Sequence, residues 1–110
     1  MANPNILKIY DTLVSQFSGV ERKGKTTPYT STNTYMFSFI GKDGNLALRL
    51  SNHDISELIE KNDASLMMQH GKILKDFICV PDSILNDRDL LKQYFQRSLD
   101  HTNSLKPKKK

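Results

Sequence analysis

The stretch TYMFSFIGKDGNLALRLS, residues 34–51, decides the fold of this chain. Large apolar side chains occupy alternate positions in both of its halves: Tyr35, Phe37 and Phe39, then Leu46, Leu48 and Leu50. A repeat of two residues is the period of a β-strand. We therefore expect two strands paired as a hairpin, with the aromatic residues and the leucines on one sheet face, packed against a helix.

Gly41-Lys42-Asp43-Gly44 connects the two strands and carries the residue types of a phosphate-binding loop. Its spacing is too short for such a loop, and neither a helix nor a serine or threonine follows the lysine. Asp-Gly supplies the positive φ angles that tight hairpin turns require. The segment is therefore predicted to be a turn without a phosphate site.

An amphipathic helix is predicted before this hairpin. Asn3-Pro4 has the pattern of an N-cap followed by a first-turn proline. Apolar residues then recur at steps of three and four until Gly19: Ile6, Ile9, Leu13 and Phe17. The polar segment that follows predicts a short edge strand over residues 20–25 and a loop over residues 28–33, because Pro28 disfavours a central strand.

The second half of the chain alternates helical and strand patterns. Ser51 or Asn52 is expected to cap a helix that buries Ile55, Leu58 and Ile59. Residues 66–68 and 73–80 predict two strands joined by a turn, and residues 82–85 predict one helical turn. Asn86 is expected to cap a final helix, whose inner face carries Leu90, Leu91, Tyr94, Phe95 and Leu99.

The predicted order is helix, three strands, helix, two strands, helix. It indicates a two-layer α+β domain with a mainly antiparallel five-stranded sheet. We expect residues 1–105 to form this single domain and residues 106–110 to be a lysine-rich disordered tail.

Composition excludes several classes of protein. The 37% hydrophobic and 25% charged residues are typical of a globular chain, and one cysteine permits neither an internal disulfide nor a multi-cysteine zinc site. The amino terminus lacks the pattern of a signal peptide, and no segment reaches the roughly 20 apolar residues of a membrane span. We expect a cytoplasmic protein with no membrane partner.

The net charge of +4 lies in the last five residues. When the four lysines there are left out, 12 of the 16 basic side chains remain, and they balance the 12 acidic ones. The rest of the chain is therefore neutral. A solubilising tail is the preferred interpretation, with nucleic-acid contact as the alternative. The candidate anion or nucleic-acid contacts are Arg22, Lys23, Lys25, Lys106, Lys108, Lys109 and Lys110.

No residue pattern predicts catalysis, a cofactor or a metal site. Cys79 alternates with Phe77 in an apolar strand, which favours a small core residue over a nucleophile paired with His70. The histidines lack metal-site spacing, and the acidic residues at helix starts are explained by capping: Asp54, Asp82, Asp87 and Asp89. We expect no enzyme.

Several of these segments resemble the TfoX/Sxy amino-terminal domain family, in particular its short stand-alone members with a lysine-rich end. The resemblance covers about residues 5–107 and includes Met36-Phe37, the alternating leucines of residues 46–50, Val80-Pro81 and the helix over residues 90–99. The chain carries Asn33-Thr34-Tyr35 where a Gly or His often precedes the Met-Phe pair. Full-length TfoX proteins regulate natural competence genes in bacteria, so the resemblance implies a bacterial protein with a regulatory role.

These patterns leave three hypotheses open. The first is a non-enzymatic, regulatory protein-binding module with an unknown protein partner, using an edge strand or a helix groove, or acting as a homodimer. The second is weak nucleic-acid association through the basic tail. The third is a small-ligand binder with a pocket between the sheet and the helices.

Overall fold

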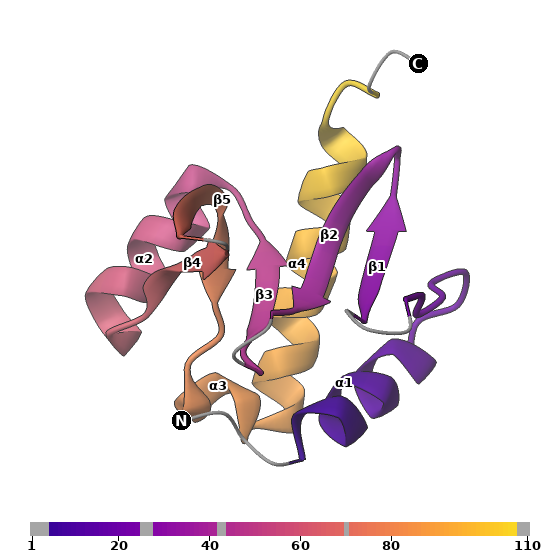
Figure 1. Cartoon of the computed structure of the whole chain (residues 1–110), viewed down its shortest axis with the longest axis horizontal. Coiled ribbons are helices and arrows are strands. Elements are labelled where there is room, and N and C mark those ends of the chain that lie inside the picture. Colours follow the sequence, from indigo (N-terminus) through magenta and orange to yellow (C-terminus); the bar gives the residue numbers. More distant parts are fainter. Residues whose placement is uncertain (1–4, 25–27, 42–43, 70, 108–110) are drawn as a thin grey trace.

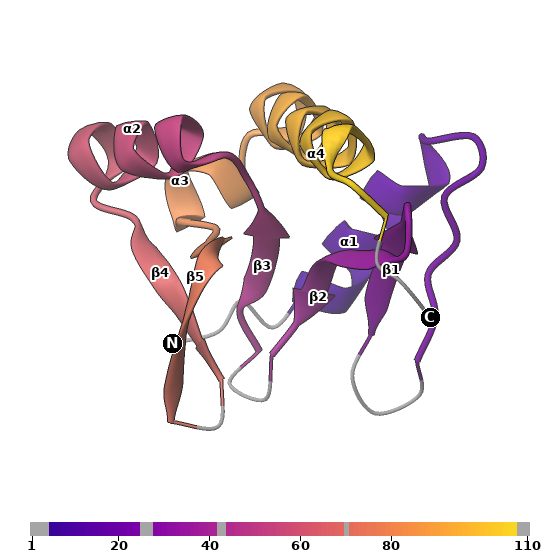
Figure 2. The same ribbon diagram turned by 90° about the horizontal axis from the view of Figure 1, so that it is seen from above.

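The structure is a computed structural model that describes residues 5–24, 28–41, 44–69 and 71–107. Within these residues a five-stranded antiparallel sheet has the order β1-β2-β3-β5-β4, and the helices pack on one of its faces (Figures 1 and 2). The elements are α1 (Ile6–Ser15), β1 (Tyr29–Thr32), β2 (Tyr35–Ile40), β3 (Leu46–Arg49), α2 (Asn52–Asn62), β4 (Ser65–Gln69), β5 (Lys72–Cys79), α3 (Asp82–Leu85) and α4 (Arg88–Ser104). The predicted α+β class and element order are confirmed.

The main core lies between the helices and the sheet. Helices α1 to α4 all contribute buried side chains to it, and so do β2, β3 and β5. The three predicted leucines of residues 46–50 are each 1% exposed and belong to this core. Phe95 of α4 lies at its centre, with ring centroids 5.3 Å from Phe37 and 4.7 Å from Phe17.

The expectation that the aromatic residues share a face with the leucines is wrong for Phe39. The sheet register pairs Phe39 with Ala47, and both belong to a second cluster with Met67 and Phe77 on the opposite face. A bulge causes the difference, because Thr30 pairs with Ser38 while the next residue pairs with Met36. Phe37 is thereby the extra residue, and both it and Ser38 contact side chains from the helices.

The strand expected at residues 20–25 is a single bridge, and a strand replaces the loop expected at residues 28–33. Lys23 exchanges two backbone hydrogen bonds with Tyr29, of 2.8 and 2.9 Å, at the start of β1. The β1–β2 turn is formed by Asn33 and Thr34, which have φ angles of 52° and 68°. Asparagine adopts this region readily, but β-branched threonine rarely does, so the turn is not evident from the sequence.

The turn between β2 and β3 agrees with the prediction. The Gly41 N–H donates to the Asn45 carbonyl and the Gly44 N–H donates to the Gly41 carbonyl, both at 2.9 Å, and Gly44 has a φ of 81°. Lys42 and Asp43 lie outside the described residues.

The helix ends agree with the sequence in part. Of the two predicted caps of α2, Ser51 and Asn52, the structure has Ser51, whose hydroxyl accepts from the Asp54 N–H at 3.2 Å. At α4 the cap is Asp87, which accepts from the Leu90 N–H at 3.2 Å, so the expectation of Asn86 is wrong. Ile59 was expected to be buried but is 42% exposed. The predicted cap at Asn3-Pro4 lies outside the described residues.

Candidate functional site

A groove of about 360 Å³ lies between α1 and the corner where α3 meets α4. Its floor is apolar: Ile9 and Leu13 come from α1, Leu85 from α3 and Leu91 from α4. Its rim is polar and includes Lys8, Thr12, Gln16, Asn86 and Arg88. We refer to this feature as the α1–α4 groove.

Helical spacing brings the groove residues that belong to α1 onto one side of that helix. Lys8, Thr12 and Gln16 follow one another at steps of four, so they form one stripe along the helix, beside the stripe of Ile9 and Leu13. The opposite wall is the junction of α3 and α4, where the chain changes direction at Asp87, the N-cap of α4. Arg88 is the first residue of α4 and therefore stands at the rim.

The electrostatic character of the groove is positive. Neither Lys8 nor Arg88 makes an ion pair with any residue that the structure describes, although Asp11, near Lys8, pairs with Arg22. No aspartate or glutamate is among the described residues that line the groove. An apolar floor beside two cations that have no ion pair with the described residues suits a ligand that has an apolar body and acidic groups.

The predicted cationic site residues do not assemble into one site. Arg22 forms an ion pair with Asp11, and Lys23 takes part in the backbone bridge to Tyr29. The Lys106 carbonyl accepts a hydrogen bond from the Tyr35 hydroxyl at 2.7 Å, and no hydrogen bond or ion pair joins Arg22, Lys23 and Lys106 to one another. The other predicted contacts lie outside the described residues: Lys25, Lys108, Lys109 and Lys110.

Sequence reasoning missed Lys8 and Arg88 as site residues. Lys8 stands between Leu7 and Ile9, and Arg88 stands between two aspartates. Their shared groove arises only when α1 packs beside α4. The helical stripe from Lys8 to Gln16 was visible in the sequence, but its proximity to residue 88 was not.

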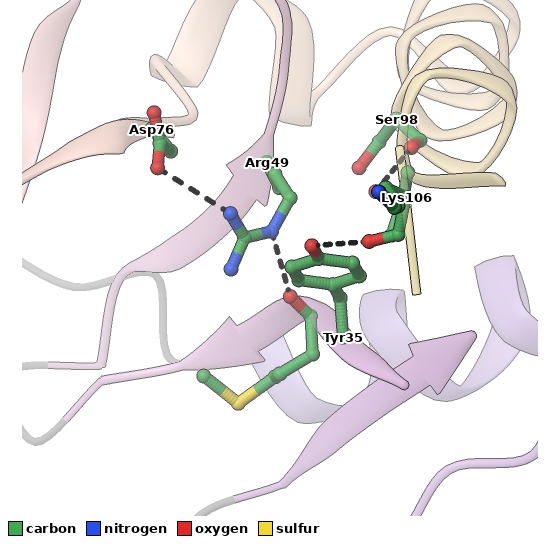
Figure 3. A network of polar contacts seen from close by, with 7 residues as sticks. Tyr35, Arg49, Asp76, Ser98 and Lys106 are labelled. Carbon is green, nitrogen blue, oxygen red and sulfur yellow. Dashed lines mark hydrogen bonds and ion pairs between the residues drawn. The ribbon is translucent and has the colours of Figure 1, made fainter. Parts of the chain in front are cut away.

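Apart from the groove, Arg49 is the centre of a polar network on the sheet (Figure 3). Its Nε–H donates to the Met36 carbonyl at 3.0 Å, and its Nη1 lies 3.5 Å from the Asp76 carboxylate. The guanidinium carbon lies 4.5 Å from the centroid of the Phe77 ring and 5.2 Å from that of Tyr35. These contacts join β2, β3 and β5. Because the Arg49 side chain is only 14% exposed and its partners lie within the sheet, we interpret Arg49 as a structural residue.

Tyr10, Ser38 and Thr30 form a hydrogen-bonded set inside the main core. The Tyr10 and Ser38 hydroxyl oxygens are 2.6 Å apart, and Thr30 Oγ1 bonds to the same Ser38 hydroxyl. All three residues are 0% exposed. Burial raises the pKa of the Tyr10 phenol above its usual value, while the hydrogen bonds to Ser38 and Thr30 lower that pKa in part. Full burial denies this set access to a substrate.

The described residues offer no metal centre and no membrane span. Among them, no group of three or more His, Cys, Asp or Glu side chains is placed to hold a metal ion. Cys79 is half-buried beside the second cluster, and His70 lies outside the described residues. In that same part of the chain, no helix combines the length and the apolar character needed to cross a membrane.

Comparison with protein-family models, with curated proteins and with solved structures finds no match to this chain. The resemblance to the TfoX/Sxy family therefore stays a prediction from the sequence.

Proposed function

We propose that this chain is a non-enzymatic protein-binding module whose α1–α4 groove receives an acidic amphipathic segment of a partner protein. The observation that supports this most is the combination of an apolar floor with Lys8 and Arg88 at the rim, neither of which forms an ion pair within the described part of the chain. An amphipathic helix or strand buries its apolar side chains on such a floor and places its acidic side chains against the cations. The resemblance to TfoX proteins favours a regulatory role in a bacterial cytoplasm.

The size of the groove limits the affinity. A volume of about 360 Å³ holds only a few side chains, and each fully buried apolar side chain contributes about 1.5–3 kcal/mol before the cost of association. We therefore expect a dissociation constant in the micromolar range, as for short recognition segments. The charged contacts are expected to set specificity and association rate.

The test is affinity capture from a bacterial lysate with a double variant, Lys8→Glu and Arg88→Glu, followed by mass spectrometry. The matched control is Lys61→Glu with Lys75→Glu, which changes the net charge equally on exposed positions outside the groove. Wild type and control are expected to retain an acidic partner that the groove variant loses. Equal capture by the groove variant would contradict the proposal.

A small acidic ligand is the second candidate occupant, because about 360 Å³ is within the range of small-molecule pockets. A panel of aliphatic and aromatic carboxylates, followed by amide chemical shifts, distinguishes the two occupants. Saturable shifts confined to residues of the groove would favour the small ligand, and turnover of the bound compound would refute the non-enzymatic proposal.

A further inference from the structure

The outer edge of β4 differs from the opposite edge of the sheet. β4 is the last strand in the order β1-β2-β3-β5-β4, and no described strand pairs with its outer side (Figure 2). Its five residues, Ser-Leu-Met-Met-Gln, contain neither a charge nor a proline, two of the usual protections of an exposed edge. The pairing of β4 with β5 shifts register between Leu66 and Met67, and the extra residues, 75–77, lie on β5. At the other edge, Lys23 bridges to β1 and covers the start of that strand.

The β4–β5 hairpin also carries exposed apolar side chains. Met68 is 56% exposed and Ile73 is 58% exposed, the largest values for large hydrophobic residues in the described part of the chain. They are directly opposite each other in the sheet register. Leu66 lies two residues before Met68 and therefore shares its strand face, but it is half-buried against the main core.

We propose that β4 pairs with β4 of a second copy of this chain, in antiparallel orientation about a two-fold axis at Met67. Antiparallel pairing centred there places Leu66 of each copy opposite Met68 of the other. Such cross-strand apolar pairs stabilise a sheet, and the two sheets join into one continuous sheet. The interface is closed and symmetric, because the same strand is used by both copies.

The charges near this edge agree with the antiparallel arrangement. Asp63 precedes β4 and Lys72 follows its turn, and both residues are exposed. An antiparallel pair brings the Asp63 end of one copy to the Lys72 end of the other, so opposite charges approach each other at both ends. A parallel pair would instead align each end with the same end of the second copy and place like charges together.

The interface is small. A five-residue strand buries less than the roughly 1,200–2,000 Å² of a stable complex, so we expect a weak, concentration-dependent dimer. β4 lies at the opposite edge of the sheet from β1 and away from the α1–α4 groove (Figure 1), so dimerisation and partner capture can fail independently.

Sedimentation equilibrium of the full chain tests the proposal. Met68→Lys introduces a charge opposite Leu66 of the second copy and is expected to raise the dimer dissociation constant by about tenfold or more. The matched control is Leu7→Lys, because Leu7 is also an exposed apolar residue, at 46%, but belongs to α1. A wild type that stays monomeric at millimolar concentration, or an unchanged dimer in Met68→Lys, would overturn the proposal.

Hydrogen exchange of the wild-type chain at low and high concentration gives a second readout that needs no variant. Amides of β4 are expected to exchange about tenfold more slowly at high concentration, whereas amides of β1 are expected to exchange at an unchanged rate. Protection of β1 or α1 in place of β4 would refute the assignment of the surface.

Discussion

At the scale of single residues, the buried hydroxyl set of Tyr10, Ser38 and Thr30 shows how polar groups are accommodated in this core. A buried hydroxyl without a partner costs about 1–3 kcal/mol, and here each hydroxyl has one. In the sequence, Ser38 stands in the middle of an apolar strand and Tyr10 stands on an apolar helix face. Each therefore depends on the other, and the pair joins α1 to β2.

Tyr10→Phe is expected to lower the free energy of unfolding by about 1 kcal/mol at neutral pH, because the Ser38 hydroxyl loses one partner. Burial raises the pKa of the folded Tyr10 phenol, so the unfolded chain releases this proton first as the pH rises past about 10. The contribution of Tyr10 is therefore complete below pH 10 and is lost above it. Urea unfolding at about pH 7 and about pH 10.5 measures the effect. The difference between wild type and variant should shrink at the higher pH, and a constant difference would contradict the argument.

At the scale of elements, the start of α4 depends on the short helix before it. The Asn86 N–H donates to the Asp82 carbonyl at 2.9 Å, and its φ of −87° and ψ of −1° place it in the last turn of α3. Asp87 has extended backbone angles, as an N-cap requires. Two residues, Asn86 and Asp87, thus separate the two helices. Because Asn86 is the C-cap of α3, Asp87 is the residue that caps α4.

Asp87→Ala is expected to destabilise the fold by about 1 kcal/mol, because the Leu90 N–H loses its acceptor and the helix loses a favourable negative charge at its start. Asn86→Ala is the matched control and should change the free energy of unfolding by less than half of that amount. Thermal and urea unfolding of both variants measure this. A larger effect at Asn86 would mean that the cap predicted from sequence is the true one.

At the scale of the whole molecule, the β1–β2 turn holds the end of α4 (Figure 1). The Asn33 side-chain amide donates to the carbonyls of Thr102 at 2.9 Å and Leu105 at 2.6 Å. Two further hydrogen bonds join Thr32 to Asn103 and Tyr35 to Lys106. This contact connects segments about seventy residues apart and supplies donors to carbonyls at the end of α4. The Thr102 carbonyl also accepts from the Leu105 N–H at 3.2 Å.

Asn33→Gly tests this contact, because glycine keeps the left-handed backbone and removes the two side-chain hydrogen bonds. We expect a loss of about 1–2 kcal/mol in the free energy of unfolding and faster hydrogen exchange at the end of α4. Asp63→Gly is the matched control, since Asp63 has the same φ of 52° and its side chain makes no hydrogen bond to the residues that the structure describes. An equal effect of the two substitutions would show that the backbone angle, and not the contact with α4, is what matters.

Local signals in the sequence predicted most elements correctly. The leucines of β3 face the helices, Ser51 caps α2, and the glycines at residues 41 and 44 turn the chain. Each of these signals acts within a few residues, through side-chain period, a single hydrogen bond or a permitted φ angle. For the same reason the candidate groove was not predicted, because Lys8 and Arg88 are eighty residues apart.

The sequence by itself therefore determined the order of helices and strands, the positions of most of them and the two-layer class. Only the tertiary structure decided that Phe39 faces away from the leucines, that residues 29–32 form the edge strand, and that Asp87 caps α4. The physical reason is that a bulge, a strand partner and a helix boundary are selected by contacts with distant segments: Thr30 across the sheet, the end of α4 beside Asn33, and α3 before α4. Alternation of apolar residues, capping patterns and turn propensities are local signals, so they carry no information about these long-range contacts.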